Sequence, residues 1–156
     1  MKLDKEYRFY GFGNYYLSSI QQGIQATHIV GELFTKYTPT DDQCKQLYHW
    51  ADKHKTVVLL NGGNSASLRA IHACLTKFEN SGMPFPYAKF HEDAQSLDNT
   101  LTAVGIVLPS FIYENAAKLR NSIDKDEMLQ ILKDDELCLE WEIELMQLLN
   151  QFSLAL

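Results

Sequence analysis

The 156-residue sequence lacks any apolar run long enough to cross a membrane, and its first residues contain no apolar stretch of the signal-peptide type. A spanning helix needs about 18 or more apolar residues in a row, whereas the densest stretch, residues 57–60, is interrupted at once by Asn61. Its three cysteines are widely spaced and form no CxxC pair, which is typical of buried thiols in a reducing compartment. We therefore expect a cytoplasmic protein with no membrane partner.

Several motifs that carry chemistry are also missing. Lysine and arginine are not clustered, although proteins that grip a nucleic-acid backbone usually cluster them. No serine lies in a G-x-S-x-G elbow, and the glycine turn at residues 61–65 lacks the lysine of a P-loop. His49 and His54 are spaced so that they do not share a helix face. The sequence therefore predicts no metal site and no cofactor.

The net charge of −6 is concentrated towards the C-terminus. Residues 124–144 hold nine acidic and two basic residues, a net charge of −7, which leaves +1 for the first 123 residues. A solvated helix face accounts for such a stretch. A docking surface or nucleic-acid mimicry are the alternatives.

Hydrophobic periodicity predicts an α/β fold. Strands and helices alternate, and four short apolar strands need helices on both faces to bury them. We expect a three-layer sandwich around a small four-stranded mixed sheet in residues 1–123, followed by an acidic amphipathic helical extension in residues 124–156. The predicted strands cover 7–16, 55–60, 86–91 and 101–108, and the predicted helices cover about 18–37, 41–54, 65–78, 110–121 and 125–153.

The extension carries an apolar stripe at helical spacing, which includes Leu137, Trp141, Leu145, Leu148 and Phe152. This stripe is wider than one narrow seam requires. It predicts either packing against the chain's own sheet or a homodimer.

Polar side chains recur on one face of the first predicted helix: Ser18, Gln21 or Gln22, Gln25, His28 and Glu32. The stripe begins at a helix N-terminus that follows a strand, where free N–H groups and the helix dipole favour anions. A plain solvent face is the alternative, and His28 is then a structural histidine.

Two further segments place polar groups at strand ends. The turn that begins at Asn61 could present consecutive N–H groups to an anion, or be only a turn before a helix capped by Ser65. Glu92 and Asp93 leave the third predicted strand, where carboxylates act as acid–base groups or as acceptors for a ligand.

Taken together, four segments resemble the peptidyl-tRNA hydrolases of the archaeal and eukaryotic type. That family has Ala-Gln-x-x-His-Ala in its first helix, where this chain has Ile-Gln-Ala-Thr-His-Ile at 24–29. Its Asp-Ala-Gly-x-Thr loop corresponds to Asp-Ala-Gln-Ser-Leu at 93–97, and its Thr-x-x-Gly-Ile-Gly-Pro strand corresponds to 102–109. The middle strand with its following helix fits in order. The resemblance covers about residues 7–109 and implies the same fold.

The departures from this family fall on its chemistry. Its catalytic lysine corresponds to Gln21, and the neighbouring basic residue corresponds to Ser19. The glycine and threonine of its loop correspond to Gln95 and Leu97, while the aspartate is kept as Asp93. Glutamine carries no charge, and the loss of one preorganised electrophilic group typically slows a reaction by about 10²–10³.

We therefore expect a protein that binds or sequesters a nucleotide-derived small molecule or a tRNA end without efficient catalysis. The candidate catalytic residues are Asp93 and His28. The candidate ligand-binding residues are Asn14, Tyr15, Tyr16, Ser18, Ser19, Gln21, Gln22, Gln25, Asn61 and Ser96, with the two tyrosines stacking on a base. An active hydrolase in which Lys36 or Lys89 reaches the site is one alternative. An interaction or inhibitor module that acts through the acidic tail is the other.

Overall fold

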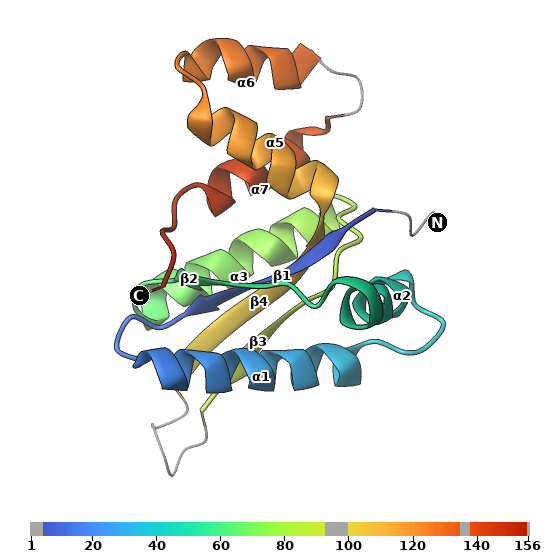
Figure 1. The fold of residues 1–156 in the computed structure, drawn as a ribbon, viewed down its shortest axis with the longest axis vertical. Coiled ribbons are helices and arrows are strands. Elements are labelled where there is room, and N and C mark those ends of the chain that lie inside the picture. Colours follow the sequence, from blue (N-terminus) through green and yellow to red (C-terminus); the bar gives the residue numbers. More distant parts are fainter. Residues whose placement is uncertain (1–4, 93–99, 135–137, 156) are drawn as a thin grey trace.

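Four strands form one mixed sheet in a computed structural model that describes residues 5–92, 100–134 and 138–155 (Figure 1). The strand order is β2-β1-β4-β3. β1 runs parallel to β2, whereas β4 is antiparallel to both of its neighbours. The strands are β1 (Tyr7–Gly13), β2 (Val57–Asn61), β3 (Tyr87–His91) and β4 (Leu101–Pro109).

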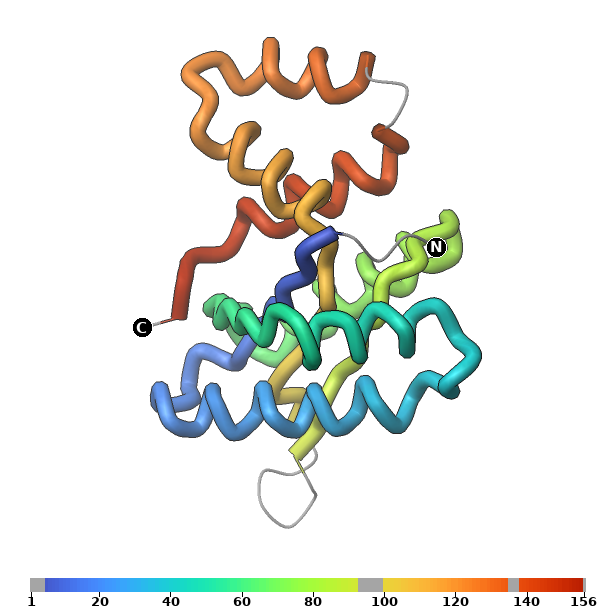
Figure 2. The backbone as a smooth tube through the Cα atoms, turned by 45° about the vertical axis from the view of Figure 1, so that its right-hand side comes forward, coloured from blue at the N-terminus to red at the C-terminus, as the bar shows by residue number. Residues whose placement is uncertain are grey.

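Helices cover both faces of this sheet, which confirms the predicted α/β fold with a small mixed sheet (Figures 1 and 2). One face packs against the first helices of the chain, and the other packs against helices from its middle and end. The first layer comprises α1 (Ser19–Lys36), α2 (Asp42–His49) and the π-helical turn η1 (Trp50–His54). The second comprises α3 (Ser65–Asn80), α5 (Ser110–Asn121) and α7 (Glu140–Leu149), with α6 (Lys125–Asp134) beside α5 and α7.

Side chains alternate along β1 between the two cores, as the period of a strand requires. Phe9 is buried beneath α1 together with Ile29 and Leu33. Tyr10 and Phe12 belong to the opposite core, which α3, α5 and α7 share. Both cores are therefore built on the same central strand.

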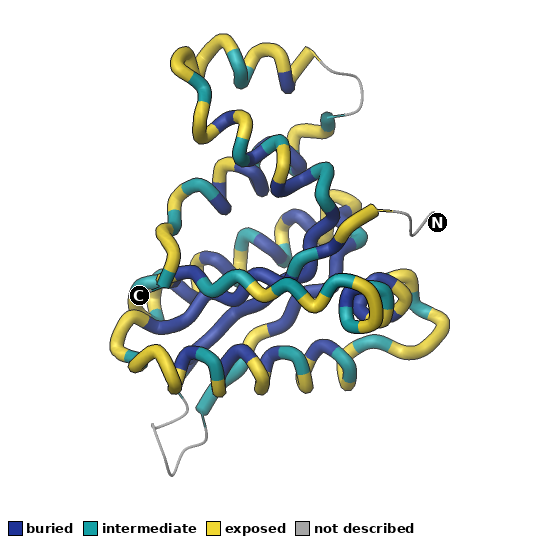
Figure 3. Tube along the Cα trace, viewed as in Figure 1, coloured by how far each residue is buried: buried dark blue, intermediate teal, exposed yellow. Residues whose placement is uncertain are grey.

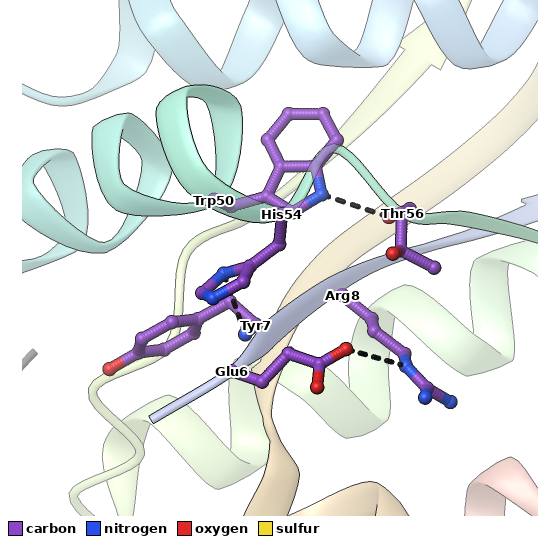
Figure 4. Close-up of polar contacts among 6 residues, drawn as sticks. All are labelled: Glu6, Tyr7, Arg8, Trp50, His54 and Thr56. Atoms are coloured by element: carbon purple, nitrogen blue, oxygen red, sulfur yellow. Dashed lines mark hydrogen bonds and ion pairs between the residues drawn. The ribbon is translucent and has the colours of Figure 1, made fainter. Parts of the chain in front are cut away.

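The η1 turn is fastened to the start of β1 (Figure 4). The backbone N–H of Tyr7 donates to Nδ1 of His54 at 3.2 Å, and Nε1 of Trp50 donates to the carbonyl of Thr56 at 2.8 Å. Lys55 then reverses the chain in the left-handed conformation, with φ at 59°. His54 is thus a structural residue, held by its contact with β1.

Two predicted boundaries are wrong. The first strand ends at Gly13 rather than at 16, because Asn14 turns the chain towards α1. Asn64, not Ser65, caps α3 by accepting from the N–H of Ser67 at 2.8 Å. The helical extension predicted at 125–153 contains two helices, α6 and α7.

The tail packs on its own chain through α7. Ile143, Leu145, Met146 and Leu148 are buried in the core that α3 and α5 line, and Trp141 and Phe152 of the predicted stripe pack against its edge. Leu137 lies outside the described residues. α6 is largely exposed and buries Leu132 (Figure 3). Of the two arrangements that the stripe predicts, cis packing accounts for the apolar face of α7.

Gly105 lets α1 approach β4 closely. A Cβ atom at this position would lie 2.5 Å from Cγ2 of Ile29 and 2.8 Å from Cε2 of Phe9. Both neighbours are fully buried. The position therefore has no room for a side chain while α1 stays where it is.

We expect Gly105→Ala to lower the free energy of unfolding by about 1–3 kcal/mol, because the methyl group must displace packed side chains. Gly31→Ala is the matched control, since Gly31 is an exposed residue of α1 and no atom lies within 4 Å of the position that its Cβ would take. The control should raise stability by about 0.5–1 kcal/mol. Urea denaturation followed by circular dichroism measures both, and equal stability of Gly105→Ala and the wild type would contradict this packing.

Candidate functional site

The candidate site lies at the sheet edge where β1 and β2 end and β4 begins (Figure 1). The N-termini of α1 and α3 lie at the same edge. In open α/β sheets, ligands bind outside the carboxyl ends of parallel strands. Most of the residues that the sequence predicts for the site are on these segments.

Asn14 joins β1 to β4 and α3. Its backbone N–H donates to the carbonyl of Thr102 at 3.0 Å, and its Nδ2 donates to Oγ of Ser65 at 3.3 Å. Its Oδ1 accepts from the N–H of Tyr16 at 3.2 Å, which forms the turn after β1. Asn14 is buried, so its amide holds the turn in place rather than facing solvent.

Gln25 bridges α1 to the strands beneath it. Its Oε1 accepts from Oγ1 of Thr102 at 2.9 Å, and its Nε2 donates to Oε2 of Glu92 at 2.9 Å. Gln25 and Thr102 are both buried. A buried amide whose oxygen and nitrogen both have hydrogen-bond partners contributes modestly to stability. Removal of one partner costs more free energy, because it leaves a buried polar group unsatisfied.

Gln22 is another buried residue of α1. Its Nε2 donates to the carbonyl of Leu17 at 3.3 Å, while its Oε1 has no partner among the described residues. Gln22 borders a cavity of about 10 Å³ together with Gly13 and Ala26. A cavity of this size has room for one water molecule at most.

Gln21 closes a capping box at the start of α1. The N–H of Ser18 donates to Oε1 of Gln21 at 2.9 Å, and the N–H of Gln21 donates to Oγ of Ser18 at 3.3 Å. The amide oxygen of Gln21, the residue that the resemblance aligns with the hydrolases' lysine, therefore accepts a hydrogen bond within the cap. The N–H groups of Ser18 and Gln21, which the sequence offers for an anion site, therefore donate within the capping box. Ser19 is the first residue of the helix and is exposed.

Tyr15 and Tyr16 form an exposed aromatic pair beside this helix start. Their side chains are 48% and 79% exposed, and their ring centroids are 4.1 Å apart. The N–H of Tyr15 donates to the carbonyl of Gly63 at 2.8 Å, which ties the pair to the turn after β2. The rings can therefore present a flat face to a ligand at this edge.

The turn after β2 uses its N–H groups within the protein. The N–H of Gly62 donates to the carbonyl of Gly13 at 2.8 Å, and that of Gly63 donates to Oδ1 of Asn61 at 3.0 Å. The N–H of Asn61 donates to the carbonyl of Ser153 at 2.9 Å. These contacts favour the turn over an anion cradle, so Asn61 serves the local fold.

His28 lies one turn along α1 from Gln25 and is exposed. Its ring stacks on Phe90 of β3 at 4.5 Å with an angle of 8° between the planes. Asp93 and Ser96, the other loop residues of the predicted site, lie outside the described residues. A pairing of His28 with Asp93 stays a prediction.

The two lysines of the hydrolase alternative lie elsewhere. Lys36 ends α1, about 25 Å from its first residue at 1.5 Å per residue. Its Nζ donates to the carbonyl of Tyr87 at 2.7 Å and lies over that ring, and burial lowers its pKa. Lys89 lines an open cavity with Lys36 and His72 between α1 and α3. Neither amine is placed with the polar groups around Gln25.

This arrangement contains acceptors and amides but little acid–base chemistry. Among the described residues that are hydrogen-bonded to one another around Gln25 and Asn14, Glu92 is the one carboxylate, and it accepts from Gln25. In the same described part of the chain, no group of three or more His, Cys, Asp or Glu side chains could hold a metal ion. Nor is any of its helices long and apolar enough to span a bilayer.

Comparison of the chain with protein-family models gives no match, and comparison with curated proteins gives none either.

Thr102 is not among the predicted site residues, and the sequence predicts Glu92 as an acid–base group or a ligand acceptor rather than as a partner of Gln25. Thr102 lies 77 positions from Gln25, and Glu92 lies 67 positions from it. The sequence signal for Thr102 as a site residue is its place near the start of a buried strand, because a buried hydroxyl needs a hydrogen-bond partner.

We expect Gln25 and Thr102 to be energetically coupled by about 1 kcal/mol, the usual net contribution of a hydrogen bond. A double-mutant cycle of Gln25→Met and Thr102→Val, measured by urea denaturation, gives this coupling. Thr27→Val replaces Thr102→Val in a control cycle with Gln25→Met, and the two changes should be additive. Thr27 is an exposed threonine of α1, and its hydroxyl donates to the carbonyl of Gly23 in the same helix. Additive effects of Gln25→Met and Thr102→Val would contradict the bridge.

Proposed function

We propose that this chain is a non-catalytic binding protein on a scaffold like that of the peptidyl-tRNA hydrolases, and that it holds a nucleotide-containing ligand at the edge where β1 and β2 end. The ligand is a nucleotide-derived small molecule or the end of a tRNA. We further propose a cytoplasmic location, in line with the wide spacing of the three cysteines, which form no CxxC pair.

The capping box at Gln21 carries the non-catalytic part of this proposal. A lysine amine at this position could stabilise developing negative charge, but the Gln21 amide is neutral and already hydrogen-bonded to Ser18. Lys36 is occupied at the far end of α1. The described residues therefore offer no ammonium group at this edge to replace the lysine that the family uses.

The exposed pair of Tyr15 and Tyr16 supports the binding part. The two neighbouring rings offer exposed faces for stacking, and aromatic faces bind bases whatever their sequence. The pair is fixed at its base by the contacts of Asn14 and Gly63. A ligand that stacks there would place its polar groups over the N-terminus of α1.

We expect titration calorimetry to detect binding of at least one member of a panel that contains the four nucleoside monophosphates and the trinucleotide CCA. Stacking on an aromatic ring contributes about 1–3 kcal/mol per base, so Tyr16→Ala should weaken binding by roughly five-fold to more than a hundred-fold.

Tyr48→Ala is the matched control, since Tyr48 is 61% exposed on α2 and packs edge-on against Phe34. It should leave affinity unchanged. Absence of heat with every member of the panel, or equal weakening by both tyrosine variants, would refute the proposed function.

A further inference from the structure

A second cavity, on the opposite face of the sheet from α1, collects positive charge in an acidic protein. Its volume is about 530 Å³, within the range of small-molecule sites. β1, β2, α5 and the segment that follows α7 form its walls. Its lining includes Arg8, Tyr10, Leu60, Tyr113, Arg120 and Phe152.

Two guanidinium groups converge on this cavity from different elements. Arg8 leaves β1 on the face away from Trp50 and His54 (Figure 4). Its guanidinium carbon lies 4.1 Å from the ring centroid of Tyr113. Arg120 comes from α5, two turns after Tyr113. The charges of Arg8 and Arg120 both act on the phenol of Tyr10, so both cations lie near it.

Few groups on the protein neutralise this charge. None of the described residues that line the cavity is acidic. Glu6 approaches Nε of Arg8 at 3.6 Å, but both side chains of the pair are partly exposed, so it holds Arg8 weakly. Arg120 is exposed, and its Nη1 donates to Oδ1 of Asn150 at 3.5 Å, which is long for a hydrogen bond. Both guanidinium groups thus keep N–H donors for a ligand.

The tyrosines of the cavity remain neutral hydrogen-bonding groups. Burial raises the pKa of Tyr113 to about 12 and also raises the pKa of Tyr10. The buried hydroxyl of Tyr113 has no hydrogen-bond partner among the described residues. Polar groups that are buried without a partner are rare in native proteins, and a ligand is one of the partners that can satisfy them.

The remaining wall is apolar and is closed by the C-terminal segment. The N–H of Ala155 donates to the carbonyl of Leu59 at 2.9 Å, so this segment lies along the outer edge of β2. Leu154 and Phe152 thereby join Leu60 in the lining. The lining thus combines two arginines with apolar side chains.

We propose that this cavity binds a small organic anion, in which one carboxylate or phosphate group on an aromatic or branched apolar body contacts Arg8 and Arg120. Planar guanidinium groups match both carboxylate and phosphate oxygens, and the tyrosine and aliphatic walls match the apolar body. The lining of this cavity does not include Tyr15 or Tyr16, and the proposal does not depend on the function proposed above.

Benzoate and phenyl phosphate are suitable probes, and benzyl alcohol is their neutral analogue. We expect the intact protein to bind at least one of the two anions in titrations followed by backbone-amide NMR, with shifts at Tyr113 and Leu154. The probe that binds more tightly shows whether the cavity prefers a carboxylate or a phosphate group. Arg120→Gln and Arg8→Gln should each weaken binding about tenfold, the usual effect of losing a charged hydrogen bond.

Lys118→Gln is the control, because it removes the same charge from an exposed position of α5 outside the cavity. It should leave binding unchanged. Arg120 is exposed, so Arg120→Gln keeps the test valid even if Arg8→Gln disturbs the stack with Tyr113. Failure of both anions to bind at millimolar concentration, equally tight binding of benzyl alcohol, or equal weakening by Lys118→Gln would overturn the proposal. Tyr16→Ala should not affect these probes, so the two sites are tested independently.

Discussion

The rest of the structure depends on how closely α1 lies on the sheet. Gly105 leaves room for Ile29 on β4, and Gln25 fixes the helix there through Thr102 and Glu92. The bridge fastens the N-terminal half of α1, and Lys36 and Tyr37 fasten its other end to Tyr87. The polar stripe of α1 therefore serves first to position the helix. The buried amides of Asn14 and Gln25 are thus committed to the fold.

Much of the architecture could be predicted from local pattern. The spacing of Ala26, Ile29 and Leu33 locates α1 and its buried face, and the β-branched run before Asn61 locates β2. Boundaries were less accurate where one side chain decides them. Asn14 ends β1 by accepting from Tyr16, and Asn64 rather than its neighbour caps α3. Both depend on the geometry of a single amide, which composition does not reveal.

The site was harder to predict, because its decisive contacts join distant parts of the chain. Sequence alone identified Gln22 and Gln25 as polar residues of one helix face, but not that both are buried. The cationic cavity shows the same difficulty. Arg8 and Tyr10 share a strand face, and Tyr113 and Arg120 share a helix face, yet only the packing of α5 over β1 brings them together. Charge counting along the sequence found no basic cluster, since these arginines are far apart in it.

The central claim is that the amide of Gln21 caps α1 at the position where the hydrolases that the sequence resembles would hold an ammonium group. The most direct measurement is the rate of peptide release from peptidyl-tRNA by the purified wild-type chain. We expect release no faster than the uncatalysed background, because the described residues place no amine at this edge and the capping box occupies the amide that stands there. Multiple turnover at ordinary enzyme rates, abolished by Asp93→Asn, would contradict the account.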